Sequence, residues 1–116
     1  MSIFNLDALA WKEGDQWVIQ FLQRDIRIQE KRLGDFDKAI QLKLKGEARM
    51  SEQGDFYPFL SNLQPAPKNI HDRWKKVEDG AYYQYSRFQT EYKSEFLPIT
   101  RFKVRVRFEK PVYIPD

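Results

Sequence analysis

The segment from 101 to 108 alternates strictly between basic and apolar side chains. The basic residues are Arg101, Lys103, Arg105 and Arg107, and the apolar residues are Phe102, Val104, Val106 and Phe108. This period of two predicts a half-buried strand that carries four cations on its other face. Such a face can contact the phosphates of a nucleic acid or an acidic protein. The same charges would also suit an edge strand, where they block edge-to-edge aggregation.

A second pattern with possible chemistry is Asp79 followed by Glu91 and Lys93. It fits the loose acid and Glu-x-Lys pattern of metal-dependent nucleases, in which two carboxylates hold Mg²⁺ and a lysine helps to activate water. The acidic residues of such a site should lie on adjoining strands, whereas the spacing around Glu91 favours a helix. The pattern is also short enough to arise by chance in a chain with 32% charged residues. We therefore assign no catalytic residue and keep a nuclease as the minor alternative.

The residues that usually bind metals or cofactors are scarce. The chain has no cysteine, which excludes a disulfide framework, a thiolate nucleophile and a cysteine-ligated zinc site. His71 is the only histidine, and we expect it on a protein surface, because one imidazole cannot build a histidine-rich metal site. Neither a glycine-rich phosphate loop nor a Gly-x-Ser-x-Gly elbow is present. We expect no metal and no cofactor.

The elements that must position the basic strand begin with three further strands. Apolar and polar residues alternate over 4–10, 16–22 and 26–29, and Gly14 lies in a turn between the first two segments. This pattern predicts an antiparallel meander. Trp17 shares a face with Ile19 and Phe21, so we expect its ring in the core, under the first helix.

Helices are expected next. Phe36, Ala39, Ile40 and Leu44 recur at helical spacing, and Gly54 follows as a stop signal. A basic cluster on this helix has the pattern of a solvated face and consists of Lys38, Lys43, Lys45 and Arg49. Residues 54–67 read as an ordered loop, and 68–79 as a short second helix. The segment 81–96 fits either a helix or a strand, and we favour the helix.

The composition bounds the class of protein. The 116 residues amount to one domain, and 41% hydrophobic residues are typical of a folded chain. The formal net charge is only +3, so a polyanion partner would need these charges to be clustered. No apolar run approaches the ~20 residues that span a bilayer, and the first residues lack the pattern of a signal peptide. We expect a cytoplasmic protein with no membrane partner.

Parts of the first 80 residues resemble HicB-like proteins, in particular their short stand-alone members. The resemblance lies in Phe4-Asn5-Leu6-Asp7-Ala8-Leu9, in Trp11-Lys12-Glu13-Gly14-Asp15-Gln16-Trp17-Val18, and in Leu22-Gln23-Arg24-Asp25-Ile26 with Gln29. It continues more weakly through Leu33 to Pro58-Phe59, Ala66-Pro67, Ile70 and Trp74. The resemblance implies a three-stranded sheet crossed by a helix, with a further strand, related to double-stranded-RNA-binding folds.

HicB proteins are antitoxins that cap a HicA-type RNase, and many add a DNA-binding module at the C-terminus. This chain departs from them at Glu30, where the family usually has a small residue, and its last 36 residues do not resemble a DNA-binding module. The resemblance therefore implies a non-catalytic, antitoxin-type module that sequesters a small protein partner, such as a HicA-like RNase, or that forms a homo-oligomer. Direct binding of nucleic acid or another polyanion by the strand 101–107 is the alternative.

Together these observations predict a single α+β domain over residues 1–116. Its expected fold is an antiparallel three- to four-stranded sheet with helices packed on one face, in the order β-β-β-α-α-β, with the segment 81–116 as an aromatic and basic-strand extension. The expected contact face consists of Arg101, Lys103, Arg105 and Arg107.

Overall fold

A computed structural model describes residues 2–54, 60–79, 85–95 and 97–109. Its strands are β1 (Ser2–Glu13), β2 (Gln16–Phe21), β3 (Arg27–Glu30), β4 (Tyr85–Tyr92) and β5 (Thr100–Phe108). Its helices are α1 (Phe36–Gln53), which follows a short 3₁₀ turn (Leu33–Asp35), and α2 (Lys68–Asp79). The predicted helices at 36–53 and 68–79 and the final strand are confirmed.

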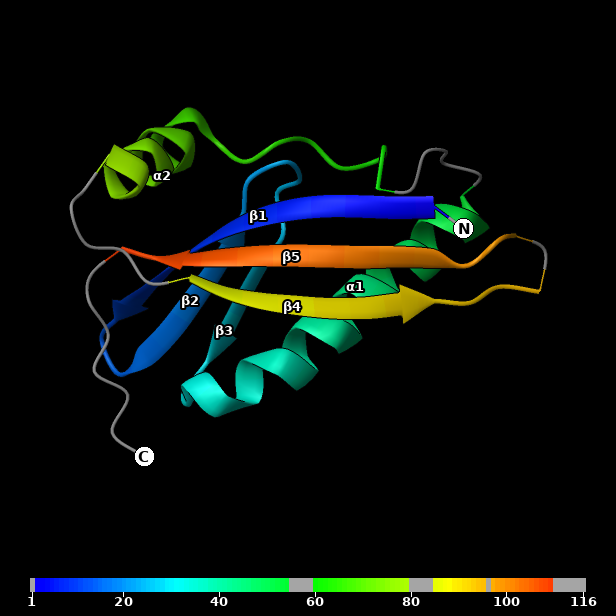
Figure 1. Cartoon of the computed structure of the whole chain (residues 1–116), viewed down its shortest axis with the longest axis horizontal. Helices are drawn as coiled ribbons and strands as arrows, with labels where there is room; N and C mark the ends of the chain where they lie inside the picture. The colour runs from blue at the N-terminus through cyan, green and yellow to red at the C-terminus, as the bar shows by residue number, and fades with distance from the viewer. Residues whose placement is uncertain (1, 55–59, 80–84, 96, 110–116) are drawn as a thin grey trace.

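The five strands form one sheet in the order β3-β2-β1-β5-β4 (Figure 1). The first three make the predicted antiparallel meander, and a two-residue turn joins β1 to β2 between Glu13 and Gln16. Gly14 occupies this turn at a φ of 64°, in the left-handed region that favours glycine. The last strand, β5, lies inside the sheet between β1 and β4, and it pairs with β1 in parallel and with β4 in antiparallel orientation.

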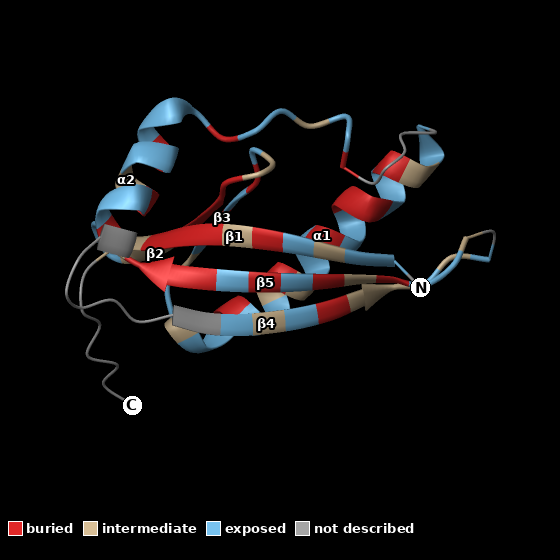
Figure 2. Ribbon diagram, turned by 45° about the horizontal axis from the view of Figure 1, so that its top comes forward, coloured by how far each residue is buried: buried red, intermediate tan, exposed pale blue. Residues whose placement is uncertain are grey.

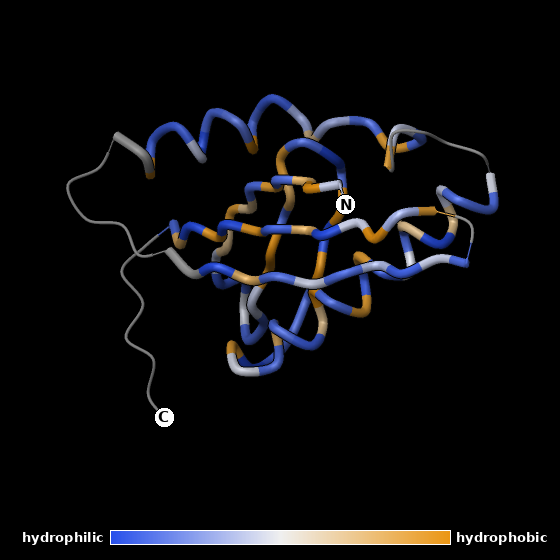
Figure 3. The backbone as a smooth tube through the Cα atoms, turned by 45° about the vertical axis from the view of Figure 1, so that its right-hand side comes forward, coloured by the Kyte–Doolittle hydropathy of each residue, from blue (hydrophilic) through white to orange (hydrophobic). Residues whose placement is uncertain are grey.

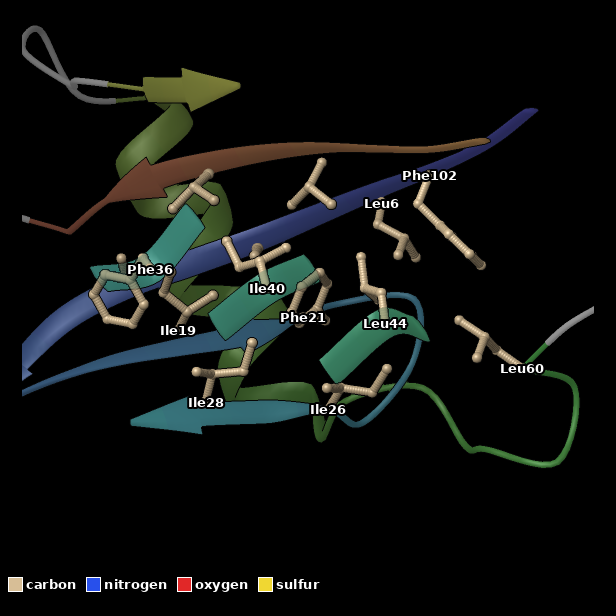
Figure 4. Packing of buried hydrophobic residues seen from close by; sticks show 14 of the residues in the cluster. Leu6, Ile19, Phe21, Ile26, Ile28, Phe36, Ile40, Leu44, Leu60 and Phe102 are labelled. Carbon is tan, nitrogen blue, oxygen red and sulfur yellow. The ribbon is translucent and has the colours of Figure 1, made fainter. Parts of the chain in front are cut away.

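The main core lies between α1 and one face of the sheet. Leu6, Ala8 and Ala10 point to this face from β1, and Ile40 and Leu44 meet the sheet from the helix. Figure 4 shows the side chains of α1 packed against those of the meander. Figure 3 shows hydrophobic and hydrophilic residues alternating along the strands, as a sheet with distinct faces requires.

Trp17 lies on the predicted face but only at the margin of this core. Its ring is half-buried and meets the Phe108 ring edge-on, with 6.3 Å between centroids. The prediction that Trp17 lies in the core is confirmed in part, because the ring packs against the core while one side of it stays exposed.

The second helix packs on the opposite face of the sheet, so the prediction that the helices share one face was wrong. Ile70, Trp74 and Val77 bury their side chains against Leu9 of β1 and form a small separate cluster. Leu9 lies on the face away from α1, since its neighbours Ala8 and Ala10 both point toward that helix. A sheet with apolar residues on both faces needs cover on both. The cover from α2 is confined to the end of the sheet where β5 finishes (Figure 1).

The favoured helix at 81–96 was also wrong, because residues 85–92 form β4; residues 80–84 and 96 lie outside the described part of the chain. Phe88 is half-buried and Thr90 is buried, whereas Arg87 and Gln89 are exposed. These four residues therefore alternate between the two faces of the sheet, as those of a strand do. Pairing along the whole of β5 supplies backbone hydrogen bonds that a local helical pattern cannot reveal. With this strand and the parallel β1–β5 pair, the predicted antiparallel three- to four-stranded sheet is instead mixed and five-stranded.

Within the described residues, no helix is both long enough and apolar enough to cross a membrane.

Candidate interaction surface

The sheet face opposite α1 is covered by α2 at one end only, and we call the remainder the open face. Figure 2 shows exposed residues interleaved with buried ones along β4 and β5 in this region. Strand pairing places three rows of side chains across it. They are Ile3, Arg101 and Glu91; Asn5, Lys103 and Gln89; and Asp7, Arg105 and Arg87.

Arg105 is held by a carboxylate from the neighbouring strand. Its Nε lies 3.0 Å from Oδ1 of Asp7, and the side-chain amide of Gln23 donates to the other carboxylate oxygen at 2.9 Å. The backbone N–H of Asp7 donates in turn to Gln23 Oε1 at 2.8 Å. These contacts fix Asp7 and direct the exposed guanidinium of Arg105 across the sheet.

Arg101 is paired as well, with Glu91. The two guanidinium donors Nη2 and Nε lie 2.9 Å and 3.2 Å from Glu91 Oε1, and both side chains are partly exposed. Glu91 of the nuclease-like pattern is thus engaged in an ion pair, while Lys93 lies just beyond the end of β4 and is exposed. The side chain of Asp79 lies outside the described residues. The described part of the chain shows no cluster of three or more acidic or histidine side chains arranged to hold a metal.

Arg107 shares the face with the other three predicted contact residues, but α2 covers it. Only 5% of its surface is exposed, and its guanidinium carbon lies 4.4 Å from the centroid of the Trp74 ring. Such stacking is a cation–π contact, which is stronger when water is excluded. Of the four predicted contact residues, Lys103 and Arg105 are exposed, Arg101 is half-exposed, and Arg107 is buried.

The open face is hollowed between β1, β5 and β4. A trough of about 530 Å³ is lined by polar side chains from all three strands, namely Asn5, Asp7, Arg87, Gln89, Lys103 and Arg105. It offers amide groups, a carboxylate and cations within one concave surface. These side chains can both donate hydrogen bonds to a partner and accept them from it.

Several residues of this surface were not predicted from the sequence. Asn5 and Ile3 lie at alternate positions of β1, so the period of two already placed them on the face away from the core. Arg87 and Gln89 could not be found in this way, because 81–96 was expected to be a helix.

The other sequence-predicted features lie away from the open face. Within the basic cluster of α1, Lys38, Lys45 and Arg49 are exposed, and Lys43 pairs with Glu47 at 3.4 Å. His71 is exposed on α2.

Comparisons of this chain with protein-family models, with curated proteins and with solved structures found no match. The functional interpretation therefore rests on the surface itself.

Proposed function

We propose that this protein is a non-catalytic binding module that sequesters a protein partner through the open face of its sheet. The observation that carries this proposal is the composition of that hollowed face. It combines amides and charges of both signs with an apolar side chain, Ile3, that is 52% exposed at its end. Protein interfaces have this mixture of apolar, hydrogen-bonding and charged groups.

The pairing of the cations favours a protein partner over a polyanion. Arg105 and Arg101 already contact the carboxylates of Asp7 and Glu91, with which a phosphate would have to compete. Among the described residues Lys103 makes no ion pair, which leaves one uncommitted cation from the predicted stripe of four. To bind a nucleic acid, this face would have to neutralise several phosphates, which needs more uncommitted positive charge than it supplies.

The class of partner that we propose is a small RNase of the HicA type, because the first 80 residues resemble HicB-like antitoxins. The three strands of the meander followed by α1 are compatible with the three-stranded sheet and crossing helix that this resemblance implies. In such a complex the module inactivates its partner by covering it, so no catalytic group of its own is needed.

The test is a charge change in the middle row of the open face. Asn5 and Lys103 are exposed neighbours, so the double variant Asn5→Asp, Lys103→Glu should leave the fold intact. The matched control, Asn69→Asp with Lys75→Glu, makes the same charge change on the exposed surface of α2. The partner is first identified by co-purification with the tagged wild-type protein, and its dissociation constant is then measured by calorimetry for all three proteins.

We expect the open-face variant to bind at least about tenfold more weakly, which corresponds to about 1.4 kcal/mol, and the control to bind like the wild type. Equal binding by all three proteins would place the contact elsewhere. Co-purified nucleic acid whose affinity falls steeply as salt rises would support the polyanion alternative.

A further inference from the structure

The outer edge of β4 is a second feature of the molecule that can dock a partner. β4 ends the strand order, and among the described residues no strand pairs with its outer side. It spans eight residues without proline or lysine, and its register with β5 is unbroken. The opposite edge of the sheet, β3, has only four residues. Short strands, lysine, proline, other charged side chains and bulges protect sheet edges from added strands. Of these devices β4 has only the charged side chains of Arg87 and Glu91, and both project from the open face and not along the edge.

A positively charged groove runs beside this edge. It encloses about 640 Å³ between β4 and α1, and its lining includes Lys45 and Arg49 from the helix and Lys93 from beyond the strand. The one carboxylate among its described lining residues, Glu91, is paired with Arg101. A neighbouring hollow of about 600 Å³ is lined by Arg49 and Lys93 together with Glu52 and Glu95, so the excess of positive charge belongs to the first groove. Lys45, Arg49 and Lys93 are all exposed, and none of them forms an ion pair with a described residue. Figure 1 shows α1 behind the sheet on the side of β4.

We propose that the outer edge of β4 binds an extended acidic segment of a partner protein, which adds a sixth strand to the sheet. The backbone of the segment would hydrogen-bond to β4, as in other cases of strand addition. Every second side chain of the segment would point toward α1, at a spacing of about 6.6 Å. Lys45 and Arg49 are four residues apart on the helix, a rise of about 6 Å, so two successive carboxylates on that side can each meet a cation.

A second copy of this chain fits the edge less well. If two β4 strands paired with both α1 helices on the same side of the joined sheet, Lys45 and Arg49 of each copy would approach their counterparts. Like charges at such a junction oppose association. The charge of the groove therefore selects an acidic strand.

Gln89 lines both this groove and the trough of the open face, but the cations that each proposal uses are different, since Lys45 and Arg49 of α1 lie on the other side of the sheet from Lys103. The two proposals can therefore succeed or fail independently.

The experiment is an NMR titration of the ¹⁵N-labelled full chain with a capped ten-residue peptide that alternates glutamate and valine. We expect the largest shifts at the amides of β4 and at the facing side of α1. The double variant Lys45→Glu, Arg49→Glu should weaken binding by about tenfold or more. The control Lys75→Glu, Lys76→Glu makes a similar charge change on α2, and its affinity should stay within about twofold of the wild type.

Two further peptides separate strand pairing from simple charge attraction. A peptide that alternates lysine and valine should not bind the wild type, and a glutamate–valine peptide methylated at alternate backbone nitrogens should lose its binding. Equal affinity of the methylated peptide, or no loss in the Lys45→Glu, Arg49→Glu variant, would overturn the proposal. So would a concentration-dependent dimer of the free chain whose interface maps to β4, because a second copy would then occupy the edge. The Asn5→Asp, Lys103→Glu variant should still bind the acidic peptide, whatever it does to the partner of the open face.

Discussion

Replacing Arg107 by alanine should destabilise the fold far more than replacing Arg105. Both residues belong to the same alternating stripe of β5, and their side chains start from the same face of the sheet. Their surroundings differ, because α2 covers Arg107 and leaves Arg105 exposed. The pair therefore isolates the effect of tertiary cover on chemically identical side chains.

The expected magnitudes follow from the contacts. In Arg105→Ala the chain loses a partly exposed ion pair with Asp7, which contributes about 0.2–1 kcal/mol. It also loses a longer, exposed contact with the Trp74 ring, at 5.7 Å from the ring centroid, which contributes about 0.5–1 kcal/mol at most. Arg107 loses a contact with the Trp74 ring at 4.4 Å in a site from which water is largely excluded, which contributes about 2 kcal/mol. It also loses the packing of its buried aliphatic stem. We expect a total loss of about 2–4 kcal/mol for Arg107→Ala.

The assay is equilibrium unfolding in urea, with the free energy of unfolding extrapolated to water at a common slope. Circular dichroism is the better signal, because the change next to Trp74 will itself alter tryptophan fluorescence. Arg107→Met serves as an internal control, since it keeps a long apolar stem and removes the cation. Its stability should lie between that of the wild type and that of Arg107→Ala.

A loss for Arg107→Ala no larger than the loss for Arg105→Ala would refute this reasoning. It would mean that α2 is not held over β5 in solution. If Arg107→Met were as unstable as Arg107→Ala, the charge would account for the effect and the packing of the stem would not.

Two further predictions concern α1. Leu44→Ala should cost about 2–5 kcal/mol, because Leu44 is fully buried against the sheet. Leu42→Ala on the same helix should change stability by less than about 0.5 kcal/mol, because Leu42 is 62% exposed. Thermal unfolding measures both losses, and a loss for Leu42→Ala as large as that for Leu44→Ala would contradict this orientation of the helix. The hydroxyls of Ser94 and Tyr92 donate to Glu52 and hold the pKa of this carboxyl below its ordinary value. The ionised carboxylate therefore stabilises the fold fully at a pH above the ordinary pKa, and this stabilisation is lost as the pH falls through the lowered pKa. The stability advantage of the wild type over Glu52→Gln should therefore be full at neutral pH and shrink in acid, and an advantage that does not depend on pH would contradict this role of Glu52.

The sequence by itself determined most of the local structure. The period of two in 4–10, 16–22 and 101–108 predicted strands and assigned their faces, and the helical spacing of Phe36, Ile40 and Leu44 predicted the buried side of α1. These predictions succeeded because a half-buried element must alternate its side chains with its own period. The alternation also placed four cations on one face of β5, where the structure has them.

Only the tertiary structure decided how these elements combine. Local periodicity cannot state which strand lies beside which, so the parallel pairing of β5 with β1 was not predicted, nor was the strand at 85–92 that pairs with its other side. Nor can it state what covers an exposed face. The stripe of β5 therefore looked uniform in the sequence, whereas in the fold α2 buries Arg107 under Trp74 and leaves Lys103 open to a partner.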